Sequence, residues 1–454
     1  MEIYLPQEVN MALNSLEQYG FEGYLVGGCV RDSLLDLSPQ DWDLVTSAKP
    51  QQIKAIFSDY RIVEAGIKYG TITVIINEKP IEITTYRVEG MYSDNRHPDT
   101  VRFVKSLEED LSRRDFTVNA LAYHPQKGLI DYFQGLRDLQ QKRIRSVGNP
   151  HERFKEDSLR IMRALRFAAT YQFTIGAKTA KAMVLQKELL GNIAAERIRL
   201  ELEKLLCGEG VKAVLRDYVN IIGVVIPELL PMIDFKQHNP HHHLDVWEHT
   251  LACLDKTPKE KVLRLVMLFH DIGKPLCFTM DEKGIGHFYG HNRVSLEIAK
   301  TVLKRLKYDR VTLKQVESLI LYHDVLVIPE TKYVKRWLNR LGEENFRLLL
   351  EVKKADAQGK NPKIVQDKLY HIEKLENIFK KVIDERQCFS LKSLAINGND
   401  LLQLGVPQGK SLGLMLDTIL KKVVNEEVEN ERKKLLTLAE NLYADSVSEM
   451  SQIQ

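Results

Sequence analysis

The chain has 454 residues, with 65 basic and 62 acidic side chains and a formal net charge of +3 at pH 7. This balance excludes a strongly basic field over the whole surface, so a nucleic-acid site must be a local patch. The length predicts several domains. Five scattered cysteines, no secretory signal and no apolar run of roughly 20 residues predict a cytoplasmic protein without a membrane span.

Two glycines followed by two aspartates form the first motif. Gly27 and Gly28 lie between a short apolar strand and a helix predicted to start at Arg31. Glycines at such a turn let backbone N–H groups approach a phosphate, so Gly27, Gly28 and Arg31 are predicted to bind nucleotide. Asp41 and Asp43 are two apart in a predicted strand, so both carboxylates are expected on one face. Paired carboxylates beside a phosphate cradle predict Mg²⁺-dependent phosphoryl or nucleotidyl transfer.

The strings Gly-Gly-Cys-Val-Arg-Asp at 27–32 and Asp-Trp-Asp at 41–43 resemble a known signature. It belongs to the polymerase-beta-like nucleotidyltransferases, specifically the class II CCA-adding and bacterial poly(A) polymerase family. The resemblance implies an N-terminal head with a mixed sheet and helices, and Mg²⁺ on the two aspartates. Asp36 stands where the family usually has a glycine, in the loop after the helix.

A β-hairpin is predicted next, with strands at 70–76 and 81–87 around a turn at 77–80. Glu82 in the second strand is either a third carboxylate beside the metal pair or an ordinary solvent-facing residue. The polar stretch 87–98 predicts a mobile loop. It resembles the flexible loop that CCA-adding enzymes use when they switch from C to A.

Residues 113–120, Arg-Arg-Asp-Phe-Thr-Val-Asn-Ala, match the family's next signature. The guanidinium of Arg114 suits a triphosphate, because its planar fork matches phosphate oxygens. Asp115 and Asn119 are predicted to hydrogen-bond a ribose 2′-hydroxyl. The site would then prefer NTP over dNTP.

Beyond about residue 152 the strand patterns nearly vanish. Amphipathic periodicity predicts helices at 153–171, 194–207, 244–256, 260–270, 311–323 and 412–439.

Asp157 and Arg160 are three apart in the predicted helix 153–171 and are expected on one face. A carboxylate accepts hydrogen bonds and a guanidinium donates them, so the pair matches the edges of cytosine and adenine but opposes guanine and uracil. In the CCA-adding family this Glu-Asp-x-x-Arg element is the protein template for nucleotide choice, which the match implies here. Arg163 and Arg166 are candidates for steadying phosphates. Residues 195–199 resemble the following neck motif, with a structural role expected.

The string Leu-Phe-His-Asp-Ile-Gly-Lys at 268–274 resembles the HD-domain phosphohydrolases. The resemblance implies a hydrolytic site for cyclic or terminal phosphates, or a retained structural metal centre. Histidine and aspartate suit a transition metal such as Mn²⁺, Ni²⁺ or Fe²⁺. Asp324 competes for the last ligand position, and the histidines at 238 and 241–243 predict a solvated loop. The predicted ligands are His249, His270, Asp271, His291, His323 and Asp356.

The predicted fold class is α+β, with a nucleotidyltransferase head followed by all-α regions. The predicted domains are the head at 1–145, a helical neck with the nucleotide-selecting motif at 146–235, an HD domain at 236–365 and a helical tRNA-binding region at 366–454. The expected reaction is template-independent transfer of CMP and AMP from CTP and ATP to the tRNA 3′ end, which completes CCA. The alternatives are an enzyme that adds only A, a poly(A) polymerase, and an HD phosphohydrolase acting on RNA ends.

Overall fold

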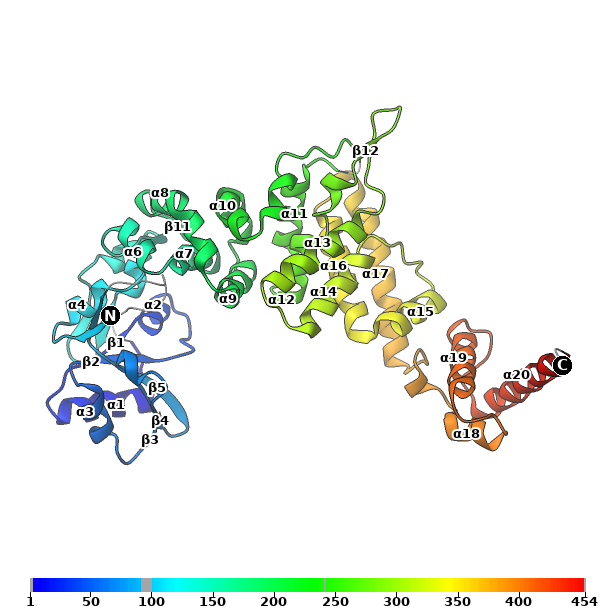
Figure 1. Cartoon of the computed structure of the whole chain (residues 1–454), viewed down its shortest axis with the longest axis horizontal. Helices are drawn as coiled ribbons and strands as arrows, with labels where there is room; N and C mark the ends of the chain where they lie inside the picture. The colour runs from blue at the N-terminus through cyan, green and yellow to red at the C-terminus, as the bar shows by residue number, and fades with distance from the viewer. Residues whose placement is uncertain (1–2, 91–99, 241, 453–454) are drawn as a thin grey trace. The chain divides into compact units, whose positions relative to one another are not determined.

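A computed structural model describes residues 3–90, 100–240 and 242–452 (Figure 1). The chain divides into two compact units, residues 1–230 with 305–307, and residues 231–304 with 308–454. Over the described ranges, no helix has the length and apolar character needed to cross a membrane.

A seven-stranded mixed sheet organises the head, in the order β3-β4-β5-β2-β1-β8-β9. Strands β2 and β5 run parallel, and the other neighbouring pairs are antiparallel. The mixed sheet confirms the predicted fold class. The strands are β1 (Gly23–Val26), β2 (Asp43–Thr46), β3 (Arg61–Val63), β4 (Thr71–Ile76), β5 (Lys79–Thr85), β8 (Ala122–His124) and β9 (Gly128–Ile130).

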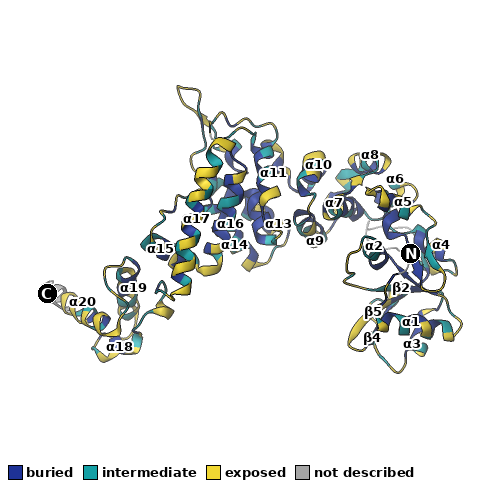
Figure 2. Ribbon diagram, turned by 180° about the vertical axis from the view of Figure 1, so that it is seen from behind, coloured by how far each residue is buried: buried dark blue, intermediate teal, exposed yellow. Residues whose placement is uncertain are grey.

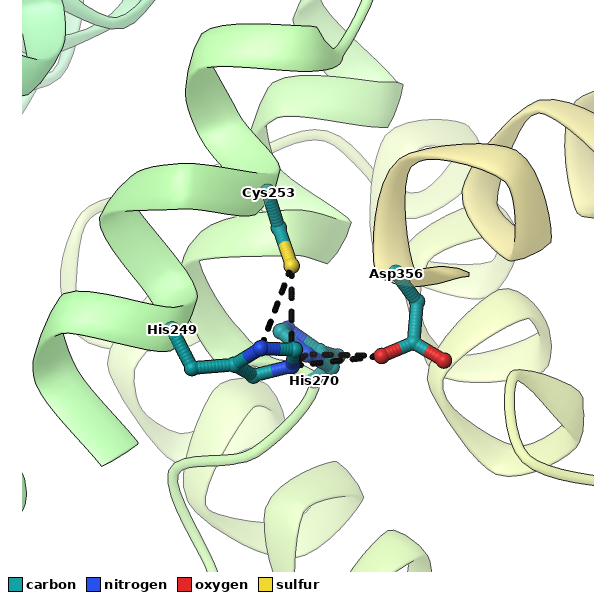
Figure 3. A group of neighbouring side chains, drawn as sticks. All are labelled: His249, Cys253, His270 and Asp356. Carbon is teal, nitrogen blue, oxygen red and sulfur yellow. Dashed lines mark hydrogen bonds and ion pairs between the residues drawn. The ribbon is translucent and has the colours of Figure 1, made fainter. Parts of the chain in front are cut away.

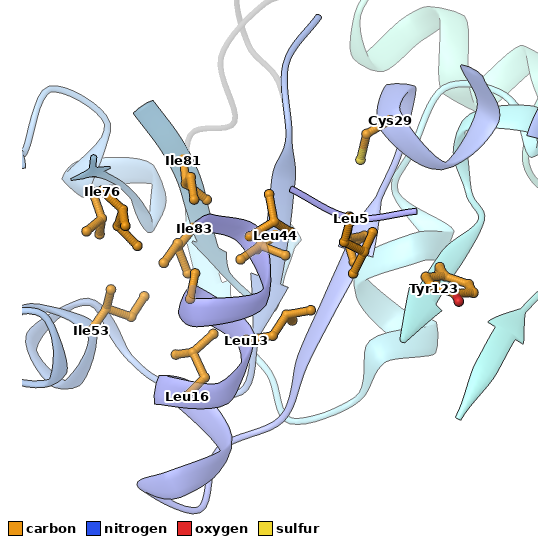
Figure 4. Packing of buried hydrophobic residues seen from close by; sticks show 14 of the residues in the cluster. Leu5, Leu13, Leu16, Cys29, Leu44, Ile53, Ile76, Ile81, Ile83 and Tyr123 are labelled. Carbon is orange, nitrogen blue, oxygen red and sulfur yellow. The ribbon is translucent and has the colours of Figure 1, made fainter. Parts of the chain in front are cut away.

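Alternate side chains of a strand point to opposite sides of the sheet. Both faces are buried at the central strands β1, β2 and β8. On one face, Leu44 and Ile83 pack with Leu13 and Leu16 of α1 (Gln7–Gln18) and with residues of α3 (Pro50–Ile56), as Figure 4 shows. On the other face, Val26, Val45 and Tyr86 pack with Leu107 and Leu111 of α4 (Leu107–Ser112). These two cores fix the positions of the strand ends at which the candidate active-site residues of the head lie.

The predicted hairpin is confirmed as β4 and β5. Its turn residues, Asn77 and Glu78, have φ of +48° and +64°, the backbone that two-residue hairpin turns need. The prediction of a loop at 87–98 is wrong for its first three residues, which form strand β6 (Arg87–Glu89). This strand pairs with β7 (Val101–Phe103). The rest of that loop, residues 91–99, lies outside the described residues.

Helices follow the head, as predicted, but two of them are shorter than expected. The predicted helix 153–171 breaks at Asp157, whose backbone is extended (φ −135°, ψ 102°). The predicted helix 412–439 divides into two, and Glu426 after the first has φ of +64°. The first unit contains α2 (Gly28–Leu34), α5 (Gly135–Gln140), α6 (Pro150–Glu156), α7 (Leu159–Tyr171), α8 (Ala177–Gln186), α9 (Ala195–Leu206) and α10 (Val211–Val225), with the short pair β10 (Arg143–Ile144) and β11 (Thr174–Ile175).

The second unit is helical apart from the short pair β12 (Thr279–Met280) and β13 (Gly286–His287). In Figure 2, many residues of α14 and α16 are buried, whereas many residues of α17 are exposed. The predicted boundary between residues 365 and 366 falls inside α17, and the four-part division stays a prediction. The helices are α11 (Val246–Lys256), α12 (Lys261–Phe269), α13 (His291–Arg305), α14 (Arg310–Tyr322), α15 (Thr331–Leu341), α16 (Glu343–Gln358), α17 (Pro362–Asp384), α18 (Gly398–Gln403), α19 (Lys410–Val424) and α20 (Arg432–Gln452).

Candidate active site

Three carboxylates lie together at the start of β2. The parallel register pairs Asp43 with Glu82 of β5, and Asp41 stands two residues earlier along the chain. Strand β2 begins at Asp43, so the prediction that Asp41 lies in a strand is wrong. The pKa of Asp43 is raised to about 6, chiefly by burial and also by the negative charges of Glu82 and Asp41, against the opposing charge of Arg114. These oxygens form a site for a cation.

The sharp turn at Gly27 leaves space for the side chain of Arg114 at the same end of the sheet. Gly27 has φ of +76°, a conformation that favours glycine, and ends β1 just before α2. A Cβ atom on Gly27 would lie 2.9 Å from Nη1 of Arg114, so a larger residue would push the guanidinium away. Gly28 opens α2, and a Cβ atom there would make only an ordinary contact of 3.6 Å with Nη2 of Arg31. Gly27 is therefore the glycine that the approach of a guanidinium to the backbone requires.

A chain of hydrogen bonds joins the other predicted nucleotide-binding residues of the head. Arg31 Nη1 donates to Asn119 Oδ1 at 2.5 Å, and Asn119 Nδ2 donates to Asp115 Oδ1 at 2.9 Å. Arg163 donates to Asp115 Oδ2 through Nε at 2.8 Å and Nη2 at 2.6 Å. Burial tends to raise the pKa of Asp115, but Arg163 and Asn119 outweigh it and hold the pKa at about 2. Asp115 is therefore a fixed negative charge.

The predicted pairing of Asp157 with Arg160 on one helix face is wrong, because the helix breaks between them. Asp157 accepts from Arg197 of α9 at 3.0 Å and from the N–H of Leu159 at 3.1 Å, at the start of α7. Arg160 instead donates to Glu156 Oε2 at 2.9 Å and to the carbonyl oxygen of Arg113 at 3.0 Å. Sequence reasoning gave the stretch around Arg197 a structural role and missed this partner, although an arginine cluster was visible there.

Arg166 has a carboxylate partner that the sequence did not reveal. Its Nε lies 2.6 Å from Oε2 of the buried Glu201, which also lies 3.8 Å from Nη1 of Arg163. The Arg166 guanidinium also lies 3.9 Å from the centre of the Phe167 ring. These contacts hold the Arg166 guanidinium between α7 and α9.

The six ligands predicted in the second unit come together in two adjoining groups. In the first, His249 Nε2 lies 3.2 Å from Asp356 Oδ1 and 3.5 Å from His270 Nε2 (Figure 3). In the second, His291 Nε2 and His323 Nε2 are 3.3 Å apart. Asp271 faces both groups, with Oδ2 3.4 Å from His249 Nε2 and Oδ1 3.5 Å from His291 Nε2. Two ligand atoms on one transition metal, each about 2.1 Å away, are spaced similarly.

Backbone carbonyls orient all four imidazoles. Each Nδ1 lies 2.7–3.0 Å from a carbonyl oxygen, that of Gly359, Met267, Phe288 or Ile320. A carbonyl oxygen only accepts, so each Nδ1 carries a proton and each ring presents its Nε2 atom to the cluster. Burial also lowers the pKa of His249, and that of His323 to about 3, which keeps these rings neutral. The donor set fits one or two transition metals.

Other groups at this centre were not predicted. The Cys253 sulfur lies 3.5 Å from His249 Nε2, and the Lys274 ammonium lies 2.7 Å from Asp271 Oδ2. Lys360 pairs with Asp356. His242 lies in a loop, as predicted, but its side chain is partly buried: its ring centre is 5.0 Å from that of His249, and burial lowers its pKa to about 2. The four-residue spacing of Cys253 from His249 on a helix was the available signal.

Three family models match the chain. The poly(A) polymerase head domain matches residues 23–145, a probable RNA- and SrmB-binding site of polymerase A matches 172–231, and a putative second domain of tRNA nucleotidyltransferases matches 279–439.

Relatives match over nearly the whole length. The CCA-adding enzyme of Limosilactobacillus reuteri (strain DSM 20016) is 35% identical over 431 residues, which cover 95% of each chain. That of Pediococcus pentosaceus is 34% identical over 446 residues, covering 97% of this chain and all of the relative. The Bacillus stearothermophilus CCA-adding enzyme in complex with CTP is 28% identical, with a TM-score of 0.67 over 98% of each chain. The Thermotoga maritima CCA-adding enzyme complexed with tRNA, at 20% identity and a TM-score of 0.56 over 96% of each chain, shows the shared fold.

The raised pKa of Asp43 predicts a stability effect in the metal-free protein. The native state binds the Asp43 proton more tightly than the unfolded chain, so this group costs stability as pH rises from about 4 through about 6. We expect Asp43→Asn to raise the free energy of head unfolding by about 1–2 kcal/mol at pH 7.5 in EDTA, a value discounted for partial exposure. Thermal unfolding at pH 4 and 7.5 checks this. The exposed Asp59→Asn is the control, and equal stability of wild type and Asp43→Asn at pH 7.5 would contradict it.

The ligand geometry predicts which aspartate binds metal in the second unit. Adding Mn²⁺ or Ni²⁺ at about 100 times its dissociation constant should stabilise the folded protein by about 2.7 kcal/mol. Asp356→Asn should reduce that gain, whereas Asp324→Asn should keep it, because Asp324 is exposed and lies outside both groups of ligand atoms. Thermal unfolding with and without metal measures both variants. The reverse ranking would assign the distal ligand to Asp324.

Proposed function

The chain belongs to the family of CCA-adding enzymes, which are nucleotidyltransferases, and we propose that its head builds or repairs the 3′-terminal CCA of tRNA through Asp41 and Asp43. The observation that carries the residue assignment is the grouping of Asp41, Asp43 and Glu82 at the start of β2, with Arg114 beside it. A grouping of acidic oxygens next to a guanidinium suits a nucleoside triphosphate with its metal.

Mg²⁺ is the metal we propose for the head. The donor set is entirely carboxylate oxygen, which suits a hard cation, and the raised pKa of Asp43 reports crowded negative charge that a cation would relieve. When bound to Asp41 and Asp43, Mg²⁺ supplies charge stabilisation for the reacting phosphates.

In the proposed reaction, the 3′-hydroxyl oxygen of tRNA attacks the α-phosphorus of CTP or ATP in line. A new P–O bond forms, the bond to pyrophosphate breaks, and the hydroxyl proton passes to a base. Glu82 is the proposed base, since its register places it next to Asp43.

The other assignments follow the contacts of each residue. Arg114 binds the triphosphate, and Asp115 with Asn119 faces the ribose. Asp157 and Arg160 select the base from separate positions, with Arg197 holding the Asp157 carboxylate and Glu156 holding the Arg160 guanidinium. Each base-selecting group therefore has a fixed direction before nucleotide binds.

Nucleotide incorporation on a series of tRNA ends tests the function. The acceptors are transcripts ending at the discriminator base, at C, at CC and at CCA, with labelled CTP and ATP given separately and together. We expect every shorter end to be extended to CCA and then to stop, and Asp41→Asn to abolish incorporation. Adding A only to the CC end would make the protein an A-adding enzyme, and a long A tail would make it a poly(A) polymerase.

Base choice tests the contact between α9 and Asp157. Arg197→Ala frees the Asp157 carboxylate, so we expect misincorporation of UTP or GTP to rise by about 10-fold, as a hydrogen bond to a charged group is worth about 1.5–3 kcal/mol. Asp157→Ala should do the same. Lys204→Ala, on the same helix, is the matched control. Unchanged fidelity in Arg197→Ala alone would mean that Arg197 is only structural.

A second activity, a phosphohydrolase in the second unit, is supported by the cavity that opens on its ligand cluster. This cavity has a volume of about 430 Å³ and is lined by Asp271, His291 and Lys274 as well as Lys360 and Lys368. Ammonium groups beside metal ligands suit a phosphate ester. We propose Mn²⁺, Ni²⁺ or Fe²⁺ as its metal, since imidazole and carboxylate ligands suit these ions.

Crossed variants separate the two activities. Asp271→Asn should abolish metal-dependent hydrolysis of 2′,3′-cyclic AMP and of p-nitrophenyl phosphate but retain nucleotide incorporation, whereas Asp41→Asn should do the opposite. Absence of hydrolysis in the metal-loaded wild type, with metal-dependent stabilisation present, would make the cluster a structural metal centre. Loss of incorporation only in Asp271→Asn would overturn the transferase assignment.

A further inference from the structure

One face of α7 connects the neck to the nucleotide-binding residues of the head. Arg163, Phe167 and Tyr171 are each four residues apart and therefore share that face. Phe167 is buried and packs edge-on against Phe116, inside the 113–120 motif, with ring centres 5.8 Å apart. The helix that carries Arg160 is thus packed directly on the segment that carries Asn119.

Arg31 is the head residue that this face encloses. Its guanidinium carbon lies 4.7 Å from the centre of the Tyr171 ring and 5.1 Å from that of Phe167. Arg31 donates through Nε and Nη2 to Asp32, at 2.9 and 3.0 Å, and the Tyr171 hydroxyl donates to the same carboxylate at 2.9 Å. Burial raises the pKa of Tyr171 to about 12, so this hydroxyl keeps its proton. Arg31 and Asn119 are both 6% exposed, so the hydrogen bond between them is largely shielded from water.

These contacts close a ring that begins and ends on α7. From Tyr171 it passes through Asp32 and Arg31 to Asn119, and from Asn119 through Asp115 back to Arg163. Each link is a hydrogen bond of 2.5–2.9 Å with an ionised or amide partner, the stronger class of such bonds.

The ring determines which way the Asn119 amide faces. Arg31 only donates, so the group it meets must be the amide oxygen, and Asp115 is an acceptor, so it must meet the NH₂ group. The Asp115 carboxylate is also fixed by the N–H of Phe116, which donates to Oδ1 at 2.8 Å. The NH₂ group of Asn119 has a second N–H with which to meet a ligand. A rotation of the amide by 180° would exchange donor and acceptor and oppose both neighbours.

We propose that Arg31 and Tyr171 are positioning residues for sugar selection, which fix the Asn119 amide so that it can recognise a ribose 2′-hydroxyl. The inference rests on the proposed role of Asp115 and Asn119 at the ribose. It adds the orientation of Asn119 to the nucleotide-binding role predicted for Arg31. A deoxyribose has no 2′-hydroxyl, so the fixed amide discriminates against dNTP only while the ring is intact.

The test compares kcat/KM for CTP and dCTP on a tRNA ending at the discriminator base. Tyr171→Phe removes one hydrogen bond and keeps the stacked ring, so the CTP/dCTP ratio should fall about 2- to 10-fold. Tyr171→Leu also removes the stacking and should lower the ratio further. Tyr24→Phe is the matched control, because it loses one hydrogen bond, to Lys127, elsewhere in the head. Discrimination between CTP and UTP should not change in Tyr171→Phe, a readout that general loosening of the neck would move.

Asn119→Ala separates this inference from the role on which it rests. If Asn119→Ala leaves the CTP/dCTP ratio unchanged, the proposed ribose contact itself is wrong. If Asn119→Ala lowers the ratio and Tyr171→Phe and Tyr171→Leu do not, the ring has no positioning role. We expect the double variant Tyr171→Leu/Asn119→Ala to equal Asn119→Ala in this ratio, because the tyrosine acts only through the amide. Additive effects would overturn the inference.

Discussion

Crowding of negative charge at the start of β2 is the constraint on which the head depends. Parallel pairing of β2 with β5 places Glu82 beside Asp43, and Asp41 adds a third carboxylate. Such a grouping costs stability unless a cation or guanidinium offsets it. The sharp turn at Gly27 admits Arg114 to the same edge of the sheet. Repulsion among these carboxylates therefore lowers the stability of the folded head, and a bound triphosphate with its metal would offset that loss.

The second unit also contains buried negative charge, but different residues offset it. Asp271 and Asp356 are buried among four histidines, and Lys274 and Lys360 neutralise them. Backbone carbonyls fix every imidazole so that its Nε2 atom faces the cluster. A centre organised to this degree before metal binds loses little freedom on binding, which favours affinity and a defined geometry. The two units thus prepare cation sites of different chemistry, one of oxygen ligands and one of mixed nitrogen and oxygen ligands.

Much of the fold and of both sites could be predicted from the sequence, because the signals were local. Alternation gave the β4–β5 hairpin, and helical periodicity gave the helices of the neck and the second unit. The prediction was wrong at Asp157, since an extended residue there ends one helix and its carboxylate starts the next. Helical periodicity continues across such a break, so the pattern of apolar residues alone does not reveal it.

The sequence by itself determined the chemical groups: the paired aspartates, the arginines of the head and neck, and the six predicted ligands of the second unit. Only the tertiary structure decided which groups meet. It paired Asp157 with Arg197, Arg166 with Glu201 and Arg31 with Asn119, and it placed Cys253 and the His242 ring beside His249. The physical reason is that residue types and spacing determine which bonds a side chain can make. Its actual partner depends on how distant elements pack, and packing energy is distributed over the whole core.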